Sequence, residues 1–335
     1  TFSVEPLRID AASVALWNYK VSLVEGSNRP LTFNGLPSVT IPAGGRVVSD
    51  PAALAVDAQQ DLAVSLYVPG ANVPISQHTS AFTTSYLTPN GAGNHAGSMD
   101  RSAFTVTTTS MYWLSAVEVF SSSTTSAIIA FGDSITNGTC STVDAHDRWQ
   151  DLLAVRLLPP DGKGMAVVNA GIGGNTLTRA NLTPPPNSPP GTERLDRDVL
   201  EQAGVTHVIL FMGTNDIGRQ ASAAQVMTGM QEVIDRVKAI GLKIIGVTII
   251  PRHNQPPTET SMGWDDTKTA IRNEVNEWIR HQASFDAVLD FDEVLRDPAN
   301  LNLINPLFNC DGVHPNSFGY FVMGRSIDLG SIPDM

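Results

Sequence analysis

The chain has 335 residues, of which 42% are apolar and only 16% are charged, and its formal net charge is −12. This length is comfortable for two domains, and the apolar content excludes a chain that is disordered overall. The negative charge argues against a nucleic acid partner, and no apolar stretch approaches the roughly 20 residues of a membrane-spanning helix. We therefore expect no nucleic acid partner and no membrane span.

Residues 1–120 carry short runs rich in Val, Leu, Thr and Ser, and Pro and Gly separate these runs. Regularly spaced short strands with such punctuation are typical of an all-β sandwich. We therefore predict a jelly-roll-like β-sandwich domain over residues 1–120. The Ser- and Thr-rich residues 121–126 resemble a linker. The predicted strands lie at 31–33, 38–41, 62–68, 104–109 and 112–120.

Strands and helices alternate over residues 127–335, which predicts a parallel five-stranded sheet covered by helices on both faces. Right-handed crossovers place every strand-to-helix loop at one edge of such a sheet. The loops expected there begin at Ser134 and span 171–175, 213–216 and 251–264. The predicted strands are 127–131, 166–170, 207–212, 243–249 and 287–291, and the predicted helices are 148–158, 196–203, 223–240 and 266–282.

Two segments near opposite ends of this α/β domain carry residues for nucleophilic chemistry. The first strand ends in Gly-Asp-Ser at 132–134, which brings the Ser134 hydroxyl to the edge where open α/β sheets bind ligands. Asp311 and His314 lie three residues apart in the second segment. A serine hydroxyl needs a base to take its proton, and the base needs a partner that orients it. Together the segments predict hydrolytic chemistry.

Two intervening loops offer donors for the negative charge that develops in acyl transfer. Gly174 lies in a glycine-rich loop, and Asn215 lies in a Gly-Thr-Asn-Asp sequence. Their backbone and amide N–H groups, with the N–H of Ser134, would form a three-donor oxyanion hole. Gly and Asn are also common turn formers, and one such loop alone would have no special meaning.

Other folds with similar motifs fit the sequence poorly. An α/β-hydrolase requires Gly-x-Ser-x-Gly, but Thr136 stands two residues after Ser134. A dinucleotide-binding fingerprint begins at 171–173, but Thr176 occupies the place of its third glycine. The chain has no Gly-Lys-Ser/Thr sequence, so a phosphate-binding P-loop is excluded.

The segments at 132–134, 169–176, 213–216 and 311–314 resemble the four ordered sequence blocks of the SGNH/GDSL hydrolases. The resemblance covers residues 127–335 and extends to flanking segments such as 194–200, which resemble a secreted subgroup with an N-terminal β-sandwich. It implies a three-layer, flavodoxin-like hydrolase domain. It also implies that Ser134 is the nucleophile, His314 the base and Asp311 its orienting acid, with Ser134, Gly174 and Asn215 as oxyanion donors. No cofactor is required.

The chain contains two cysteines, Cys140 and Cys310, and in the implied fold both flank the active edge. A disulfide between them would connect the nucleophile loop to the His–Asp loop. The alternative is two unpaired small apolar residues, as is usual in a reducing cytosol. The chain starts at Thr1 without Met, as after removal of an export signal, although a trimmed chain would start in the same way. We expect a secreted, extracellular protein and a disulfide.

Further candidates lie in the loop 251–264, where His253 and Trp264 would reach a ligand, although a lone His or Trp in a loop is more often packed or solvated. The remaining histidines are scattered, so we expect no metal site.

We predict a serine esterase or lipase-like enzyme that cleaves carboxylic esters. The alternative is a carbohydrate esterase, deacetylating or of the feruloyl type, whose sandwich helps to bind a polysaccharide. A third hypothesis is a binding or adhesion protein with vestigial catalysis, which the complete set of candidate catalytic residues argues against.

Overall fold

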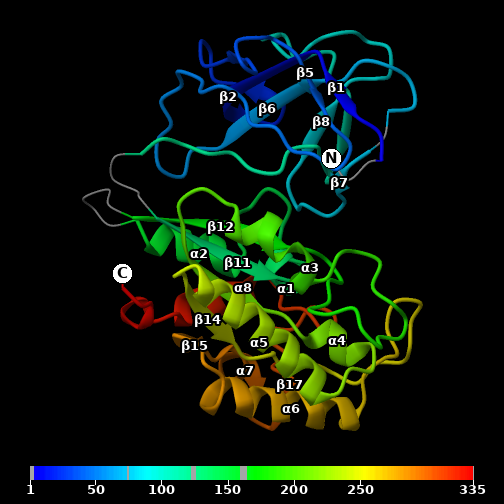
Figure 1. The fold of residues 1–335 in the computed structure, drawn as a ribbon, viewed down its shortest axis with the longest axis vertical. Coiled ribbons are helices and arrows are strands. Elements are labelled where there is room, and N and C mark those ends of the chain that lie inside the picture. Colours follow the sequence, from blue (N-terminus) through cyan, green and yellow to red (C-terminus); the bar gives the residue numbers. More distant parts are fainter. Residues whose placement is uncertain (1–3, 74, 122–125, 159–163, 335) are drawn as a thin grey trace. The chain divides into compact units, whose positions relative to one another are not determined.

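The computed structural model describes residues 4–73, 75–121, 126–158 and 164–334. The chain divides into two compact units, Thr1–Val117 and Glu118–Met335 (Figure 1). The linker predicted at 121–126 lies mostly outside the described residues, because 122–125 are not among them. Within the described part of the chain, no helix combines the length and the apolar character that a membrane crossing requires.

The N-terminal unit is built from antiparallel β-strands, as expected for a β-rich domain. Its longest strand, β2 (Ala11–Tyr19), pairs with β3, β4 and β6, and the remaining strands form three two-stranded pairs. A small core of Leu7, Ile9, Ala12 and Ile41 lies among them. The other strands are β1 (Leu7–Ile9), β3 (Ser22–Leu23), β4 (Arg29–Leu31), β5 (Val39–Ile41), β6 (Leu62–Tyr67), β7 (Gln77–His78), β8 (Ser85–Leu87), β9 (Val106–Thr108) and β10 (Met111–Tyr112).

Two expectations for this unit differ from the structure. The strand predicted over 112–120 is wrong, because β10 ends at Tyr112 and the side chains of Val117, Val119 and Phe120 are exposed. Strand β2 was not among the predicted strands. Its burial pattern has four consecutive buried residues, so it lacks the alternation that identifies a half-buried strand.

The second unit contains the predicted parallel five-stranded sheet, which the structure confirms. The strand order is β12-β11-β13-β14-β15, the flavodoxin-like order in which the chain changes direction beside its first strand. The carboxyl ends of β11 and β13 are therefore neighbours at the point where such sheets bind ligands. The strands are β11 (Ser126–Gly132), β12 (Met165–Gly171), β13 (Val205–Phe211), β14 (Lys243–Val247) and β15 (Ala287–Leu289).

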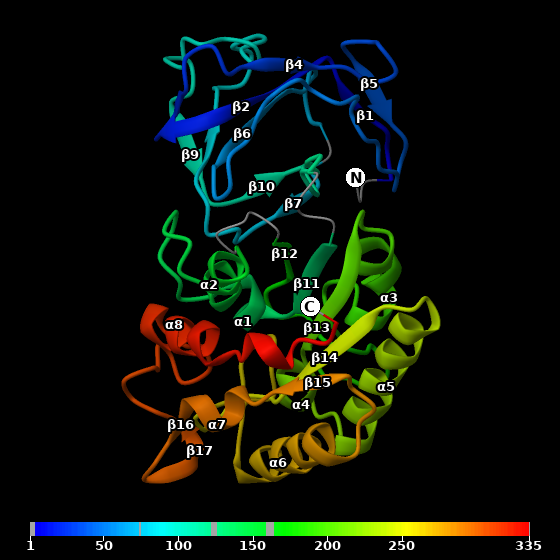
Figure 2. The same ribbon diagram turned by 90° about the vertical axis from the view of Figure 1, so that its left-hand side faces the viewer.

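Helices cover both faces of this sheet and complete the three layers (Figure 2). Alternate residues of β11 supply the two cores. Ile129 and Phe131 face α5 and α6, whereas Ile128 and Ala130 face α2, α7 and α8. The helices are α1 (Ser134–Asn137), α2 (Trp149–Arg156), α3 (Gly191–Leu195), α4 (Thr214–Gly218), α5 (Ala223–Ala239), α6 (Asp266–His281), α7 (Phe291–Leu295) and α8 (Ser317–Ser326).

Several short elements depart from the predicted helix–strand alternation. The helix expected at 196–203 is instead a single π-helical turn, Asp196–Leu200, that continues α3. A small hairpin of β16 (Arg296–Asp297) and β17 (Asn300–Ile304) follows α7, and a 3₁₀ turn at Leu329–Ser331 follows α8. Residues 251–264 form no helix, as expected for the loop after β14.

Helix α1 lies so close to the end of β12 that only glycine fits at this end of the strand. A Cβ added at Gly171 would stand 2.2 Å from the Asn137 N atom, and one at Gly132 would stand 2.9 Å from the Phe211 carbonyl oxygen. These neighbours are backbone atoms that cannot rotate away. The two glycines therefore allow the nucleophile loop to pack directly on the sheet edge.

We expect Gly171→Ala to lower the free energy of unfolding by about 1–3 kcal/mol or more, because overpacking here displaces backbone. Urea denaturation of the purified variant measures this change. Gly173→Ala is the matched control, because a Cβ there meets nothing within 4 Å. Equal stabilities of the two variants would contradict the packing argument.

Candidate active site

Ser134 is the first residue of α1, directly beyond the end of β11. The Asp133 carboxylate caps this short helix by accepting the Ile135 N–H at 3.0 Å. Gly138 ends the helix with a φ of 101°, a left-handed conformation that suits glycine, and its N–H bonds to the Ser134 carbonyl. The Ser134 side chain is thereby held at the sheet edge, where 8% of the residue remains exposed.

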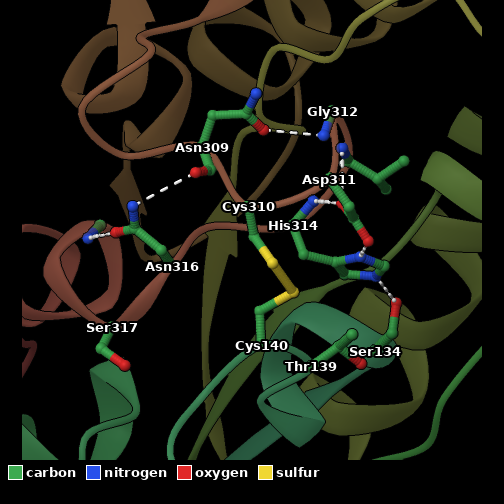
Figure 3. The surroundings of a disulfide bond; sticks show 12 residues. Ser134, Thr139, Cys140, Asn309, Cys310, Asp311, Gly312, His314, Asn316 and Ser317 are labelled. Carbon is green, nitrogen blue, oxygen red and sulfur yellow. Dashed lines mark hydrogen bonds and ion pairs between the residues drawn. A yellow bond between two sulfur atoms is a disulfide. The ribbon is translucent and has the colours of Figure 1, made fainter.

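Ser134, His314 and Asp311 form a continuous hydrogen-bonded relay (Figure 3). His314 Nδ1 lies 2.8 Å from Asp311 Oδ2, and His314 Nε2 lies 2.9 Å from Ser134 Oγ. An ionised carboxylate only accepts hydrogen bonds, so Nδ1 donates to Asp311 in this arrangement. Nε2 of the neutral ring then accepts a hydrogen bond from the Ser134 hydroxyl. This is the tautomer that a base for Ser134 requires.

Asp311 is held in its ionised form. Burial raises the pKa of its carboxyl, but hydrogen bonds from the His314 ring and backbone N–H outweigh that effect. The Val313 N–H adds a further bond, and the net result is a pKa well below the usual value. The carboxylate therefore remains negative over the whole pH range in which an imidazole changes its charge.

The disulfide expected from the sequence joins Cys140 to Cys310 across 170 residues, with 6.4 Å between the Cα atoms. Cys140 follows α1, and Cys310 directly precedes Asp311, so the bond connects the nucleophile loop to the acid–base loop (Figure 3). The Cys310 N–H also bonds to the His314 carbonyl at 2.9 Å. Cross-links that close long loops stabilise proteins by about 2–4 kcal/mol.

The two predicted oxyanion loops meet through Asn175. Gly174 has a φ of 69° and precedes Asn175, whose carbonyl oxygen accepts a hydrogen bond from Asn215 Nδ2 at 3.0 Å. Asn215 lies in α4, which begins directly after Gly213. A Cβ added at Gly213 would meet Ile249 Cδ1 at 2.9 Å. The amide nitrogen has two N–H groups, and within the described ranges the second has no protein partner.

Asp216, next to Asn215, connects these two loops through hydrogen bonds. Its carboxylate accepts the backbone N–H groups of Leu177 and Thr178 at 2.8 and 3.0 Å. Burial raises the pKa of Asp216 to about 6, although these bonds favour the ionised form. Burial likewise raises the pKa of Asp133 to about 6, against the opposing effects of the Ile135 N–H, His314 and two arginines.

Those two arginines, Arg194 and Arg252, were not singled out as site residues in the sequence. Arg252 donates to Thr214 Oγ1 at 3.1 Å and to Gln255 Oε1 at 3.2 Å, and Gln255 in turn donates to the Asp311 carbonyl at 2.9 Å. Arg252 thus connects the Asn215 loop to the His–Asp loop. A charged residue shortly after an apolar run, separated from it by Pro251, was the only sequence signal for it.

Trp264 and His253, which were predicted to contact substrate, have different environments in the structure. Trp264 is only 3% exposed, and its ring packs against the Arg252 guanidinium at 4.2 Å, so it supports that arginine from within the core. His253 is half-buried, and its N–H bonds to the carbonyl of Gly312 between the acid and the base. Its side chain lines a cavity of about 630 Å³ beside α6 and β17.

Metal-donor atoms of Cys140, Asp311 and His314 lie within 4.8 Å of one another, the one such group among the residues that the structure describes. The Cys140 sulfur belongs to the disulfide, so it offers no thiolate. The other two side chains bond to each other. This group therefore fits an acid–base pair better than a metal site.

The lowered pKa of Asp311 links stability to pH. A carboxyl whose pKa falls on folding stabilises the folded state above its unfolded pKa, and this contribution is lost as the pH falls through the folded value. We expect Asp311→Asn to lower Tm clearly at about pH 7, and we expect this difference to shrink only below about pH 4, as the pH falls from the unfolded pKa toward the folded one. Thermal unfolding of both proteins over this range measures the gap, and a gap independent of pH would contradict the linkage.

Known proteins resemble this chain. The solved structures that resemble it include a carbohydrate acetylesterase from Sinorhizobium meliloti, at 19% identity over 59% of this chain and 94% of that one, with a TM-score of 0.46. Another is an aryl esterase from M. smegmatis, at 20% identity over 60% and 95%, with a TM-score of 0.45. No curated protein matches the chain. The sequence model of the GDSL-like lipase/acylhydrolase family matches residues 130–321, more than half of the chain, and the chain therefore belongs to that family.

Proposed function

We propose that the protein is a serine esterase that cleaves carboxylic esters through an acyl-enzyme on Ser134. The observation that carries this proposal is the relay from Asp311 through His314 to the Ser134 hydroxyl, with contacts of 2.8 and 2.9 Å. Membership of an acylhydrolase family supports the reaction class. This proposal includes lipase-like activity, and it commits to no particular natural ester.

The first half-reaction forms the acyl-enzyme. His314 Nε2 takes the hydroxyl proton as Ser134 Oγ attacks the ester carbonyl carbon, and Asp311 stabilises the imidazolium. The carbonyl π electrons move to oxygen, which becomes an oxyanion beside the Ser134 and Gly174 N–H groups and the second N–H of Asn215. Collapse of this intermediate breaks the bond to the alkoxy oxygen, and His314 protonates the leaving alcohol.

Water completes the cycle by the same steps. His314 removes a proton from water, the resulting hydroxide attacks the acyl carbon, and Ser134 leaves as an alcohol that regains the proton. The ionised Asp311 favours the imidazolium in both halves. The groups named here account for every proton transfer, and the reaction needs no further reagent.

We also propose that the protein works in an oxidising compartment, outside the cell. The support is the Cys140–Cys310 disulfide, because such bonds persist in secreted proteins and are rare in the cytosol.

A second candidate function is the hydrolysis of acylated carbohydrates, which the cavity beside His253 favours. A volume of about 630 Å³ lies within the range of small-molecule sites. Side-chain amides dominate its wall, and amides both donate to and accept from hydroxyl groups. Such a wall suits a polyol better than an acyl chain. The polar wall residues are His253, Asn254, Asp266, Thr269, Asn273, Asn300 and Asn302.

We expect Ser134→Ala to lower kcat for 4-nitrophenyl acetate by at least about 1,000-fold with an unchanged Tm, because the nucleophile is lost while packing is kept. Release of 4-nitrophenol measures the rate. Ser317→Ala is the matched control, because this serine lies near the same loops and bonds to Thr142 instead. Full activity of Ser134→Ala would refute the serine mechanism.

For the carbohydrate candidate, we expect Asn302→Ala to lower kcat/KM for an acetylated xylo-oligosaccharide by about two- to tenfold, the value of one lost hydrogen bond. The rate with 4-nitrophenyl acetate should stay unchanged, because that ester is too small to fill the cavity. Acetate release compares the two substrates. Gln231→Ala, whose amide bonds to Asp235 on α5, is the control. Equal losses on both esters would argue against a sugar site.

A further inference from the structure

Arg194 is a fully buried cation at the edge of the sheet that carries the candidate site. It lies in α3 and is only 1% exposed, and its guanidinium stacks 4.2 Å from the centre of the Phe131 ring. Its only ion-pair partner within the described ranges is Asp198, 3.0 Å from Nη1. Burial lowers the pKa of Arg194 to about 10, against the attraction of Asp198, so it stays protonated at neutral pH. Such a costly charge requires a structural or functional reason.

The guanidinium joins the ends of the two strands that lead into the site. Nη2 donates to the Gly132 carbonyl at 2.8 Å, and Nη1 donates to the Ala170 carbonyl at 2.9 Å. Gly132 lies two residues before Ser134, and Ala170 lies four residues before Gly174. One rigid fork thus holds the backbone at the start of both the nucleophile loop and the glycine-rich loop.

The third contact of Arg194 leads directly to the proposed oxyanion donors. Nε donates to Asn175 Oδ1 at 2.9 Å, and Asn175 Nδ2 donates to the Pro189 carbonyl at 2.8 Å. The Asn175 side chain is therefore held at both ends, and the residue has no exposed surface. Its own carbonyl accepts the Asn215 amide at 3.0 Å. Arg194, Asn175 and Asn215 form an unbroken chain of hydrogen bonds.

We propose that Arg194 is the positioning residue of the oxyanion hole. Through Asn175 it sets the direction in which the Asn215 amide points. This inference rests on the proposed esterase function, because an oxyanion hole has a role only in acyl transfer. It assigns Arg194 no contact with substrate.

The contacts of Arg194 use a planar guanidinium whose N–H donors have fixed directions, and a lysine ammonium lacks that geometry. We expect Arg194→Lys to lower kcat for 4-nitrophenyl acetate by about 10- to 100-fold with little change in KM, because a small misplacement of donors affects mainly the transition state. Circular dichroism and Tm confirm that the variant is folded.

The decisive measurement is a double-mutant cycle with Asn215→Ala. If Arg194 acts through the Asn215 amide, Arg194→Lys should cost less than about threefold in kcat once that amide is removed, because coupled residues are not additive. A merely structural role would give the same loss in both backgrounds. That additive result overturns the inference while leaving the esterase function intact.

Two further variants guard against misfolding and general weakening. Arg236→Lys is the matched control, because Arg236 bonds to the Thr192 carbonyl and to Asp196 on the same helical segment from outside. We expect its kcat to match the wild type. Asp198→Asn keeps Arg194 but removes its ion pair, and it should give a smaller kcat loss that also disappears with Asn215→Ala.

If Arg194→Lys does not fold, the Asp198→Asn cycle decides the question. A loss from Asp198→Asn that persists with Asn215→Ala, or no loss at all, then overturns the inference. If the wild type itself hydrolyses no ester, the proposed function fails and the inference fails with it. Hydrolysis of 4-nitrophenyl acetate by the wild-type chain therefore precedes the cycle.

Discussion

The site depends on one contact, the hydrogen bond of 2.9 Å between Ser134 and His314, which are 180 residues apart in the chain. Neither loop fixes this distance alone, and three cross-connections hold them in register. The disulfide joins Cys140 to the residue before Asp311, the Tyr320 hydroxyl donates to the Thr139 carbonyl at 2.7 Å, and Gln255 donates to the Asp311 carbonyl. The first two connect backbone near Ser134 to elements next to His314, and the third holds the Asp311 backbone from the loop after β14, so the relay is formed before any substrate arrives.

Two buried arginines complete this preorganisation from different elements. Arg194 extends from α3 to the ends of β11 and β12, and Arg252 extends from the loop after β14 to Thr214 and Gln255. Burial lowers the pKa of each to about 10, so both keep their charge at neutral pH. Their field favours the ionised Asp133, and in the proposed reaction it would also favour negative charge on the oxyanion. Fixed dipoles and charges of this kind need no reorganisation during the reaction.

Much of this arrangement could be predicted from the sequence, because the parallel sheet follows from apolar strands separated by helices and puts its loops on one edge. The apposition of Ser134, His314 and Asp311 came from their residue types and the family resemblance. The parts that were not predicted depend on tertiary contacts. Nothing local to Arg194 reveals that three acceptors distant in the sequence surround it besides Asp198, and nothing local to Trp264 reveals that a guanidinium covers its ring. Strand β2 was missed because its buried residues are consecutive.

The residues of the proposed reaction and the cavity lie on different elements of this unit. The proposed reacting groups follow β11, β12 and β13 and precede α8, whereas the amide-lined cavity lies between α6 and β17. His253 connects the two, because its N–H holds the Gly312 carbonyl while its side chain faces the cavity. The hairpin of β16 and β17 has few buried side chains, so its surface tolerates change at little cost in stability. Under the proposed function, substitutions there would alter which alcohol or sugar is accepted without disturbing the relay.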